Sequence, residues 1–281
     1  MNPIRRTRII RGLKTGWLES GPQDKPLLLL LHGYPDGPAI WERQEVHFRD
    51  HFQVIRPEMR GVLDSEPAKR LGRMSTQALA FDILEVLKQV DPASSRPVFC
   101  MGHDLGAALA WTLSPLLGER LKGLITVNGL STTQMMHRLF RPAQLRRSWY
   151  MFDKQAPVLP EKVTYFFPSL VQRLAYALGD LEPADRPALD GREARYPLNQ
   201  YRAFVRELPK LLLNPSPKLH CPLLVIWGSE DAFVLPPTLD ELEPYARQIE
   251  MRILQGNHWI FRSQATKVNA LVEDFARRAL G

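Results

Sequence analysis

Short apolar runs alternate along this chain with longer amphipathic stretches, and this alternation constrains the fold more than any other feature of the sequence. The apolar runs are bounded by Gly, Pro or polar residues, which is typical of buried strands, and amphipathic helices fit between them. Repeated strand–helix units build a mainly parallel sheet, so the sequence predicts an α/β protein. The expected strands are 27–31, 54–55, 98–101, 124–127 and 223–227.

Three of the stretches between or after these strands predict helices. Ser75 is placed to cap the first helix, in which apolar residues recur at helical spacing from Leu79 to Val90 and which Asp91-Pro92 ends. The second helix is expected over 107–117 and the third over 267–280.

The strand signal disappears between Thr133 and Pro215. This segment is rich in Arg and aromatic residues and is broken by eight or more prolines, and it carries 13 Lys and Arg against 8 Asp and Glu. The alternation resumes at Pro222. We therefore expect one α/β core, formed by 1–132 and 216–281, with a helical cap inserted over 133–215.

Several classes of protein are excluded by composition. The longest aliphatic run is 27–31, far short of the roughly 20 residues that cross a bilayer, and the basic first 20 residues lack the apolar stretch of a signal peptide, so no membrane span and a cytoplasmic location are expected. The net charge of +7 is spread along the chain without a zinc-finger, RNP or basic-helix motif, so no nucleic acid is expected. Cys100 and Cys221 are predicted to be free, buried thiols.

The sharpest motif runs from an expected strand into an expected helix, from Cys100 to Ala107. It has the G-x-nucleophile-x-G form of a strand-to-helix elbow, with Asp104 between Gly102 and Gly106 in the position where a serine hydrolase has Ser. An aspartate in an ordinary turn is the alternative reading of so short a motif. The motifs around it favour a catalytic reading.

Three further motifs follow expected strands or come near the end of the chain. His32-Gly33-Tyr34-Pro35 follows the first strand, where a loop beside the elbow could offer a backbone N–H group. A carboxylate, Asp231 or Glu230, follows the strand 223–227, and His258 comes after it. The order nucleophile, acid, His is that of α/β-hydrolases.

With these motifs the chain resembles the α/β-hydrolase superfamily, and within it the epoxide hydrolases, over almost its whole length. His32-Gly33-Tyr34-Pro35 and Gly102-His103-Asp104 match the core motifs of that family. Segments around Tyr150 and Tyr201 resemble those that hold its two epoxide-activating tyrosines. The resemblance implies an eight-stranded, mainly parallel sheet flanked by helices, with an inserted helical cap.

The resemblance also implies a reaction without a metal or any other cofactor. Asp104 would attack an epoxide carbon to form an alkyl ester, while the phenols of Tyr150 and Tyr201 activate the ring oxygen. His258, oriented by Asp231, would then activate water, and the product would be a vicinal diol. The backbone N–H groups of Tyr34 and Leu105 would hold the oxyanion. A small apolar epoxide is the expected partner of a monomer or homodimer.

Some assignments have alternatives. Glu230 competes with Asp231, but the residues after Asp231 fit the acid loop of the family, and Tyr196 is the fallback for either tyrosine. We expect His32 and His103 to be structural. Asn257, which precedes His258, departs from the Gly that is usual there. The expected substrate pocket includes Trp41, Phe152 and Phe233.

Two other functions compete with epoxide hydrolysis. A haloalkane or haloacid dehalogenase would share the Asp nucleophile, but Leu105 cannot supply the side-chain N–H donor that a halide needs, and no Arg follows Asp104 closely. A catalytically silent α/β-hydrolase that acts as a binding protein typically loses one of the catalytic residues, and here every candidate is present. Which epoxide is the substrate does not follow from the sequence.

Overall fold

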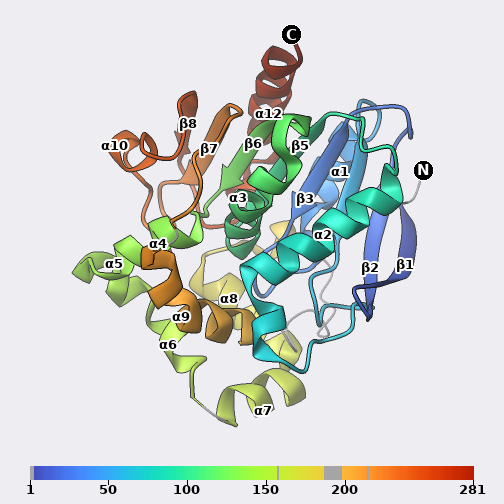
Figure 1. The fold of residues 1–281 in the computed structure, drawn as a ribbon. Coiled ribbons are helices and arrows are strands. Elements are labelled where there is room, and N and C mark those ends of the chain that lie inside the picture. The colour runs from blue at the N-terminus through green and yellow to red at the C-terminus, as the bar shows by residue number, and fades with distance from the viewer. Residues whose placement is uncertain (1–2, 157, 187–197, 214) are drawn as a thin grey trace.

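The computed structural model describes residues 3–156, 158–186, 198–213 and 215–281, and its centre is an eight-stranded sheet (Figure 1). The strand order is β1-β2-β4-β3-β5-β6-β7-β8. Strand β2 is antiparallel to both of its neighbours, whereas β4, β3 and the strands from β5 to β8 are parallel. The strands are β1 (Ile4–Ile10), β2 (Leu13–Ser20), β3 (Leu27–Leu31), β4 (Gln53–Pro57), β5 (Val98–His103), β6 (Leu121–Val127), β7 (Leu223–Gly228) and β8 (Ile249–Leu254).

The predicted α/β fold with a mainly parallel eight-stranded sheet is confirmed. The five strands expected from apolar runs are β3 to β7, which lie in the middle of the sheet and are almost wholly buried. Strands β1, β2 and β8 were not expected individually. They lie at or near the edges of the sheet and keep many exposed or half-buried residues, so their sequences lack an apolar run.

Helices cover both faces of the sheet. Successive residues of β3 point to opposite faces: Leu27, Leu29 and Leu31 pack in the core layer of α2 and α3, whereas Leu28 and Leu30 pack in the layer of α1, α11 and α12. Burying both faces explains why β3 is an uninterrupted run of leucines. The core helices are α1 (Glu42–Phe48), α2 (Thr76–Val90), α3 (Leu105–Leu117), α10 (Leu239–Leu242), α11 (Ile260–Ser263) and α12 (Ala265–Leu280), with 3-10 turns at Pro38–Trp41, Leu71–Met74, Gly118–Arg120 and Pro183–Asp185.

The three predicted helices are α2, α3 and α12. Ser75 caps α2 as expected, because its hydroxyl accepts a hydrogen bond of 3.1 Å from the backbone N–H of Ala78. Helix α3 begins two residues earlier than predicted, at Leu105, because the elbow turns directly into the helix. Helix α12 likewise begins at Ala265 rather than Lys267.

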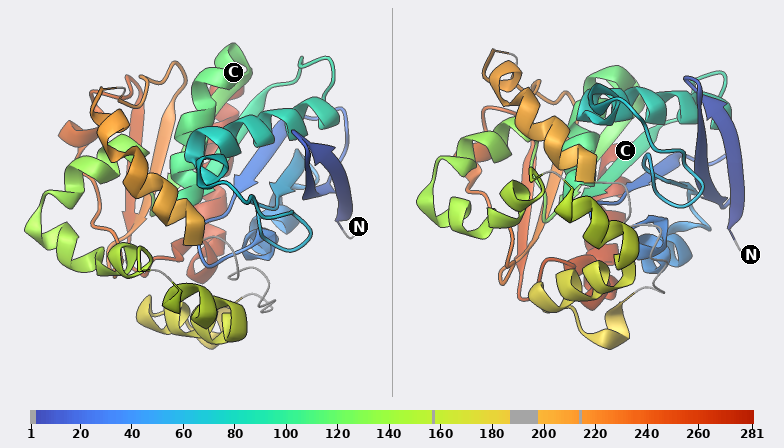
Figure 2. Two further views of the ribbon diagram at one scale, coloured as in Figure 1. Left: turned by 60° about the horizontal axis from the view of Figure 1, so that its bottom comes forward. Right: turned by 90° about the horizontal axis from the view of Figure 1, so that it is seen from below.

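In the described part of the chain, six helices follow β6 and precede β7, in the segment that the sequence set apart. They lie together at one end of the sheet, below it in Figure 1 and towards the viewer in the right-hand view of Figure 2. The described residues of 133–215 contain no strand. We refer to 133–215 as the insertion; its helices are α4 (Thr132–Leu139), α5 (Pro142–Arg147), α6 (Trp149–Asp153), α7 (Leu159–Phe166), α8 (Pro168–Leu178) and α9 (Leu198–Leu213).

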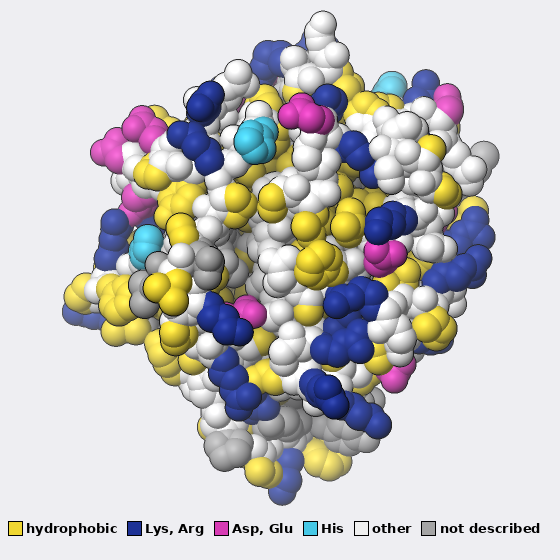
Figure 3. Space-filling model, viewed as in Figure 1, with side chains coloured by type: hydrophobic (Ala, Val, Ile, Leu, Met, Phe, Trp, Pro, Cys, Tyr) yellow, Lys and Arg dark blue, Asp and Glu magenta, His cyan; other side chains and the backbone are white. Residues whose placement is uncertain are grey.

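Other expectations from composition can be compared with the structure. Cys100 and Cys221 are both buried and free, as predicted. Among the described helices, none combines the length and the apolar character that spanning a bilayer requires. Lys and Arg side chains occur over most of the face in Figure 3, and several of them gather to the right of and below its centre.

Candidate active site

Asp104 occupies a sharp turn between β5 and α3. Its backbone has φ 52° and ψ −121°, a conformation that residues other than glycine rarely adopt. The turn is tight because neighbouring backbone lies against both glycines of the motif: a Cβ on Gly102 would strike the carbonyl of Gly106, and a Cβ on Gly106 would strike the carbonyl of Leu31. This geometry explains the G-x-D-x-G pattern, and it directs the Asp104 carboxylate out of the sheet.

Backbone N–H groups hold the Asp104 carboxylate. The N–H of Tyr34 donates to Asp104 Oδ2 over 3.2 Å, and the N–H of Leu105 also faces the carboxylate. Burial raises the pKa of Asp104, while the nearby His258 and the two N–H groups act in the opposite direction. The two donors predicted for an oxyanion therefore lie beside the candidate nucleophile.

His258 and Asp231 form a buried pair close to Asp104. His258 Nδ1 lies 2.8 Å from Asp231 Oδ2. Burial alone would lower the pKa of His258, but the charge and hydrogen bond of Asp231, together with the charge of Asp104, raise it. The pKa of Asp231 is lowered because His258 and several hydrogen bonds outweigh burial. Glu230, the alternative acid, is exposed on the surface.

Asp231 is held by a loop that follows β7. Its Oδ1 atom accepts hydrogen bonds from the backbone N–H groups of Phe233 (2.7 Å) and Val234 (3.0 Å). These bonds leave Oδ2 directed at His258, which fixes the Nδ1–H tautomer and turns Nε2 away from Asp231. A buried carboxylate with this many donors stays ionised.

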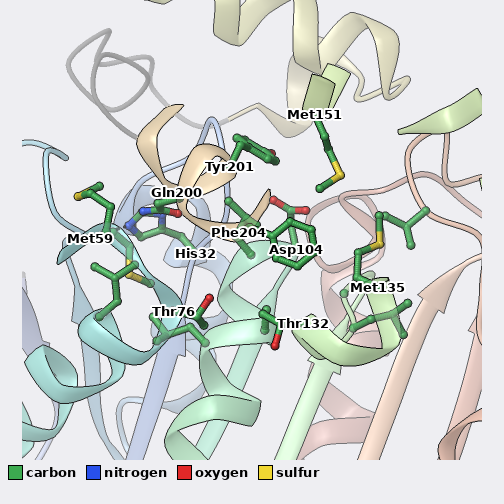
Figure 4. Close-up of a pocket in the computed structure, with 18 of the residues that line it drawn as sticks. His32, Met59, Thr76, Asp104, Thr132, Met135, Met151, Gln200, Tyr201 and Phe204 are labelled. Atoms are coloured by element: carbon green, nitrogen blue, oxygen red, sulfur yellow. Dashed lines mark hydrogen bonds between the residues drawn. The ribbon is translucent and has the colours of Figure 1, made fainter. Parts of the chain in front are cut away.

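Two cavities meet at Asp104, and both are lined by Tyr150 and Tyr201. The inner cavity lies between the core and the insertion; Figure 4 shows Asp104 and Tyr201 at its upper side and Met59, Met135 and Phe204 around it. The outer cavity is the larger of the two, opens towards the surface and contains His258. Its other lining residues include Tyr34, Phe233, Trp259, Leu174 and Leu178.

The two candidate tyrosines come from separate helices of the insertion. Tyr150 belongs to α6 and Tyr201 to α9, and their rings meet edge to face with centroids 5.9 Å apart. Burial, and then the negative charge of Asp104, raise the pKa of both phenols well above the ordinary 10. Both hydroxyls are therefore protonated near neutral pH. Tyr196, the fallback, lies outside the described residues.

The three predicted pocket residues lie in different parts of the structure. Phe233 lines the outer cavity, and its ring lies against that of His258 at a centroid distance of 5.0 Å. Trp41 does not line either cavity, because it is fully buried and packs against Phe261 on the far side of the sheet. Phe152 is 47% exposed and also lines neither cavity. For Trp41 and Phe152 the pocket assignment from sequence was wrong.

His32 and His103 are both buried in the core. His32 Nδ1 donates to the carbonyl of Gly33 and Nε2 accepts from the N–H of Met59, so the loop after β3 is fixed by a neutral imidazole whose pKa burial lowers to about 4. His103 lies behind the site, where Nε2 donates over 3.1 Å to the carbonyl of His258. Burial lowers its pKa well below 6.5.

Sequence reasoning missed two residues that hold the acid loop. Asn128, directly after β6, donates from Nδ2 to Asp231 Oδ2 over 2.7 Å. Gln144 of α5 donates to the carbonyl of Phe233 and accepts from the N–H of Leu235. In the sequence, Asn128 could have been noticed as a polar residue directly after a buried strand. No local sequence pattern identifies Gln144.

The chemistry available to this arrangement is that of organic side chains. No group of three or more His, Cys, Asp or Glu side chains in the described part of the chain is arranged to hold a metal ion. The site offers a carboxylate held by N–H donors, two protonated phenols and a histidine–carboxylate pair. Nucleophilic attack, proton donation and activation of water are each within reach of these groups.

Comparison with known proteins agrees with the fold. Residues 26–263 match the family model described as "alpha/beta hydrolase fold", so the chain belongs to the α/β-hydrolase family, as its motifs predicted. Among curated proteins it is similar to Epoxide hydrolase 3 of Xenopus tropicalis, with 26% identity over 95% of this chain and 75% of the relative. It is also similar to Epoxide hydrolase 4 of Mus musculus, with 27% identity over 95% of this chain and 77% of the relative.

Solved structures show the same fold. A putative alpha/beta hydrolase from Nostoc has a TM-score of 0.85 at 21% identity, covering 98% of both chains. A mutant of an epoxide hydrolase from Bacillus megaterium, solved with its product, has a TM-score of 0.79 at 24% identity and covers 97% of this chain and 100% of that chain. These solved structures confirm the fold, and the two curated relatives bear out the predicted resemblance to epoxide hydrolases.

Proposed function

We propose that this protein hydrolyses an epoxide to a vicinal diol through a covalent ester on Asp104. The observation that carries the proposal is the presence of a carboxylate nucleophile and two buried phenols, Tyr150 and Tyr201, around the same two cavities. A hydrolase that forms an acyl intermediate on Ser has no use for two phenols opposite its nucleophile. An epoxide does, because its leaving oxygen stays attached to the substrate and must receive a proton.

In the first half of the reaction, a carboxylate oxygen of Asp104 attacks one carbon of the epoxide ring. The ring C–O bond breaks, and the oxygen that leaves takes a proton from Tyr150 or Tyr201 while the other phenol donates a hydrogen bond to it. The raised pKa values of the two tyrosines suit this role, since they keep the protons in place at neutral pH. The product of this half is a hydroxyalkyl ester of Asp104.

In the second half, His258 takes a proton from a water molecule that attacks the carbonyl carbon of the ester. The N–H groups of Tyr34 and Leu105 would stabilise the negative charge that develops on the carboxyl oxygen. Asp231 stabilises the imidazolium that forms, through the 2.8 Å contact with Nδ1. Collapse of the tetrahedral intermediate breaks the ester C–O bond, and the leaving alkoxide takes the proton of the attacking hydroxyl group, which releases the diol and restores the Asp104 carboxylate. The proton that His258 took from water returns through solvent to the phenolate left by ring opening, so both groups regain their starting state.

The two cavities suggest where the substituents of the substrate lie. With the reacting carbon at Asp104, one substituent extends into the inner cavity, whose lining is mostly apolar, and the other into the larger outer cavity. We therefore propose an apolar epoxide substituted on both sides, with the longer substituent towards the surface. The insertion, 133–215, then acts as a cap that supplies both phenols, while 1–132 and 216–281 form the catalytic core.

A panel of aryl and alkyl epoxides and haloalkanes, followed for both diol and halide, tests the activity. A single turnover in ¹⁸O-labelled water tests the covalent step, and the label is expected in the Asp104 carboxylate rather than in the diol. Label that appears first in the diol would indicate direct attack by water. Halide release without diol formation would favour the dehalogenase alternative.

A further inference from the structure

Asp36 is a fully buried carboxylate that the reaction described above does not use. It follows Pro35 in the loop after β3 and has no exposed surface. It accepts two hydrogen bonds from different parts of the chain, one of 2.8 Å from the hydroxyl of Tyr176 in α8 and one of 2.9 Å from the indole N–H of Trp259. Burying a charged group costs free energy unless hydrogen bonds or opposite charges compensate for it. A fully buried carboxylate at this position therefore suggests a specific role.

The two partners of Asp36 connect the insertion with the catalytic histidine. Tyr176 belongs to a helix of the insertion, whereas Trp259 is the residue next to His258, and its indole packs edge to face against the imidazole with centroids 5.0 Å apart. A second set of hydrogen bonds also connects the insertion with the segment that contains His258. Asn257 donates over 2.7 Å to the carbonyl of Asp180, just past the end of α8, and accepts from the N–H of Trp259.

The charge of Asp36 also acts on the site. Asp36 is one of the carboxylates that raise the pKa of His258, after Asp231 and Asp104. Burial raises the pKa of Asp36 itself to about 6, against the effect of its two hydrogen bonds and of His258. The groups that face it are His258, Asp104, Tyr176 of α8 and His103 of β5.

The contact with His103 limits how Asp36 can be neutralised. His103 donates from Nε2 to the carbonyl of His258, so in its neutral form Nδ1 carries no proton. That Nδ1 atom lies 3.8 Å from Asp36 Oδ2 and has no hydrogen-bond partner among the residues that the structure describes. Since burial and His258 hold the pKa of His103 well below 6.5, His103 does not neutralise Asp36, whose charge acts on His258 instead.

We propose that Asp36 is a positioning residue for His258: its carboxylate ties α8 to the indole beside the histidine, and its negative charge strengthens the histidine as a base. The proposal rests on the proposed function, because it assigns His258 the task of activating water. It makes the basicity of His258 depend on a residue that does not touch the substrate.

The test combines a titration with kinetics of the two half-reactions. Asp36→Asn is the main variant, because asparagine keeps the shape and can still accept from Trp259 while it loses the charge. Asp50→Asn, on an exposed loop, is the matched control for the same chemical change. Asn257→Gly is the second control, since it removes the second set of hydrogen bonds without removing a charge.

Histidine-selective NMR titration of the free enzyme measures His258 without any substrate. In Asp36→Asn we expect the midpoint of His258 to move to lower pH by about 0.5 to 1 unit, the size expected for loss of one nearby charge. Neither control should move it. An unshifted midpoint in Asp36→Asn overturns the proposal, whether or not the protein proves to be an epoxide hydrolase.

Rapid mixing with an epoxide, followed by intact-mass measurement, separates formation of the ester from its hydrolysis. Asp36→Asn should form the ester at the wild-type rate and hydrolyse it on the order of threefold to thirtyfold more slowly. Equal losses in both steps would indicate a purely structural role and overturn the proposal. A wild-type enzyme that forms no ester at all contradicts the proposed function instead, while the titration still decides the role of Asp36.

If Asp36→Asn does not fold, Tyr176→Phe replaces it. Phenylalanine keeps an aromatic ring against Trp259 but cannot donate to Asp36. Slower ester hydrolysis with unchanged ester formation supports the proposal, and wild-type rates in both steps overturn it.

Discussion

Asn128 and His258 contact the same oxygen of Asp231. The amide of Asn128 donates to Oδ2 over 2.7 Å, and His258 Nδ1 lies 2.8 Å from that atom. The other end of the Asn128 side chain accepts a hydrogen bond of 3.1 Å from the N–H of Gly228, at the end of β7. Asn128 therefore joins the ends of β6 and β7 and fixes the direction in which Asp231 faces the histidine.

Replacing Asn128 should affect only the step that needs His258. In Asn128→Ala the Oδ2 atom keeps the histidine but loses its second donor, so Asp231 can rotate and orients His258 less well. We expect hydrolysis of the ester to slow by about tenfold, the cost of roughly one hydrogen bond to a charged group. Stopped-flow measurement of the two half-reactions checks this. A variant that loses ester formation to the same degree would contradict it.

Replacing the phenols should affect the other half. Tyr150→Phe or Tyr201→Phe removes one hydroxyl while the edge-to-face contact of the rings persists, and each is expected to slow ester formation about tenfold to a thousandfold. The double variant should nearly abolish it. Tyr245→Phe, far from both cavities, is the matched control. Wild-type ester formation in the double variant would favour a leaving group that needs no proton, such as a halide.

Much of this site could be predicted because its parts are local. The elbow around Asp104 is specified by two glycines four residues apart, and Asp104 and Asp231 follow β5 and β7, whose burial gives them apolar runs that are recognisable in the sequence. His258 follows the half-exposed strand β8 and was predicted instead from the order nucleophile, acid, His. Strands β1 and β8 were not found, because a half-exposed edge strand has no apolar run. Trp41 and Phe152 were misplaced because an aromatic residue in sequence looks the same whether it fills the core, the pocket or the surface.

Residues that act through long-range contacts were missed for a different reason. Asp36 meets Tyr176 and Trp259, which lie 140 and 223 positions further along the chain. No local pattern distinguishes it from an aspartate in a solvated loop. Only the packing of the insertion against the core gives such a residue its partners, so its role becomes visible in three dimensions alone.

The pH dependence should differ between the two half-reactions. In the free enzyme, Asp231 and the charge of Asp104 raise the pKa of His258 above 6.5. The ester removes the charge of Asp104, so the acid limb of ester hydrolysis should lie at lower pH than the titration of His258 in the free enzyme. Ester formation should show no alkaline limb below about pH 10, because the pKa of each tyrosine is raised above that ordinary value. An alkaline limb near pH 8 or 9 would contradict the assignment of the phenols.

Stability should depend on the helix cap at Ser75. Its hydroxyl accepts from Ala78 N at the start of α2 and also bonds Glu207 of α9. Ser75→Ala is expected to lower the free energy of unfolding by about 1 kcal/mol. Urea denaturation followed by circular dichroism measures this loss, with Ser75→Thr, which keeps the hydroxyl, as the variant that should restore the cap. Because Ser75 is not part of the proposed chemistry, ester formation and hydrolysis should keep their wild-type rates in the folded variant.

Replacing His258 should trap the intermediate. In His258→Gln the Asp104 carboxylate keeps its N–H donors from Tyr34 and Leu105 and can still attack the epoxide, but no base remains to activate water. The ester should therefore accumulate to about one equivalent per chain and persist for hours. Intact-mass spectrometry would show an increase equal to the mass of the epoxide, and peptide mapping would locate it on Asp104. Asp104→Asn, treated in the same way, should show no adduct. An adduct on any other residue, or turnover of His258→Gln at the wild-type rate, would contradict the division of labour proposed for Asp104 and His258.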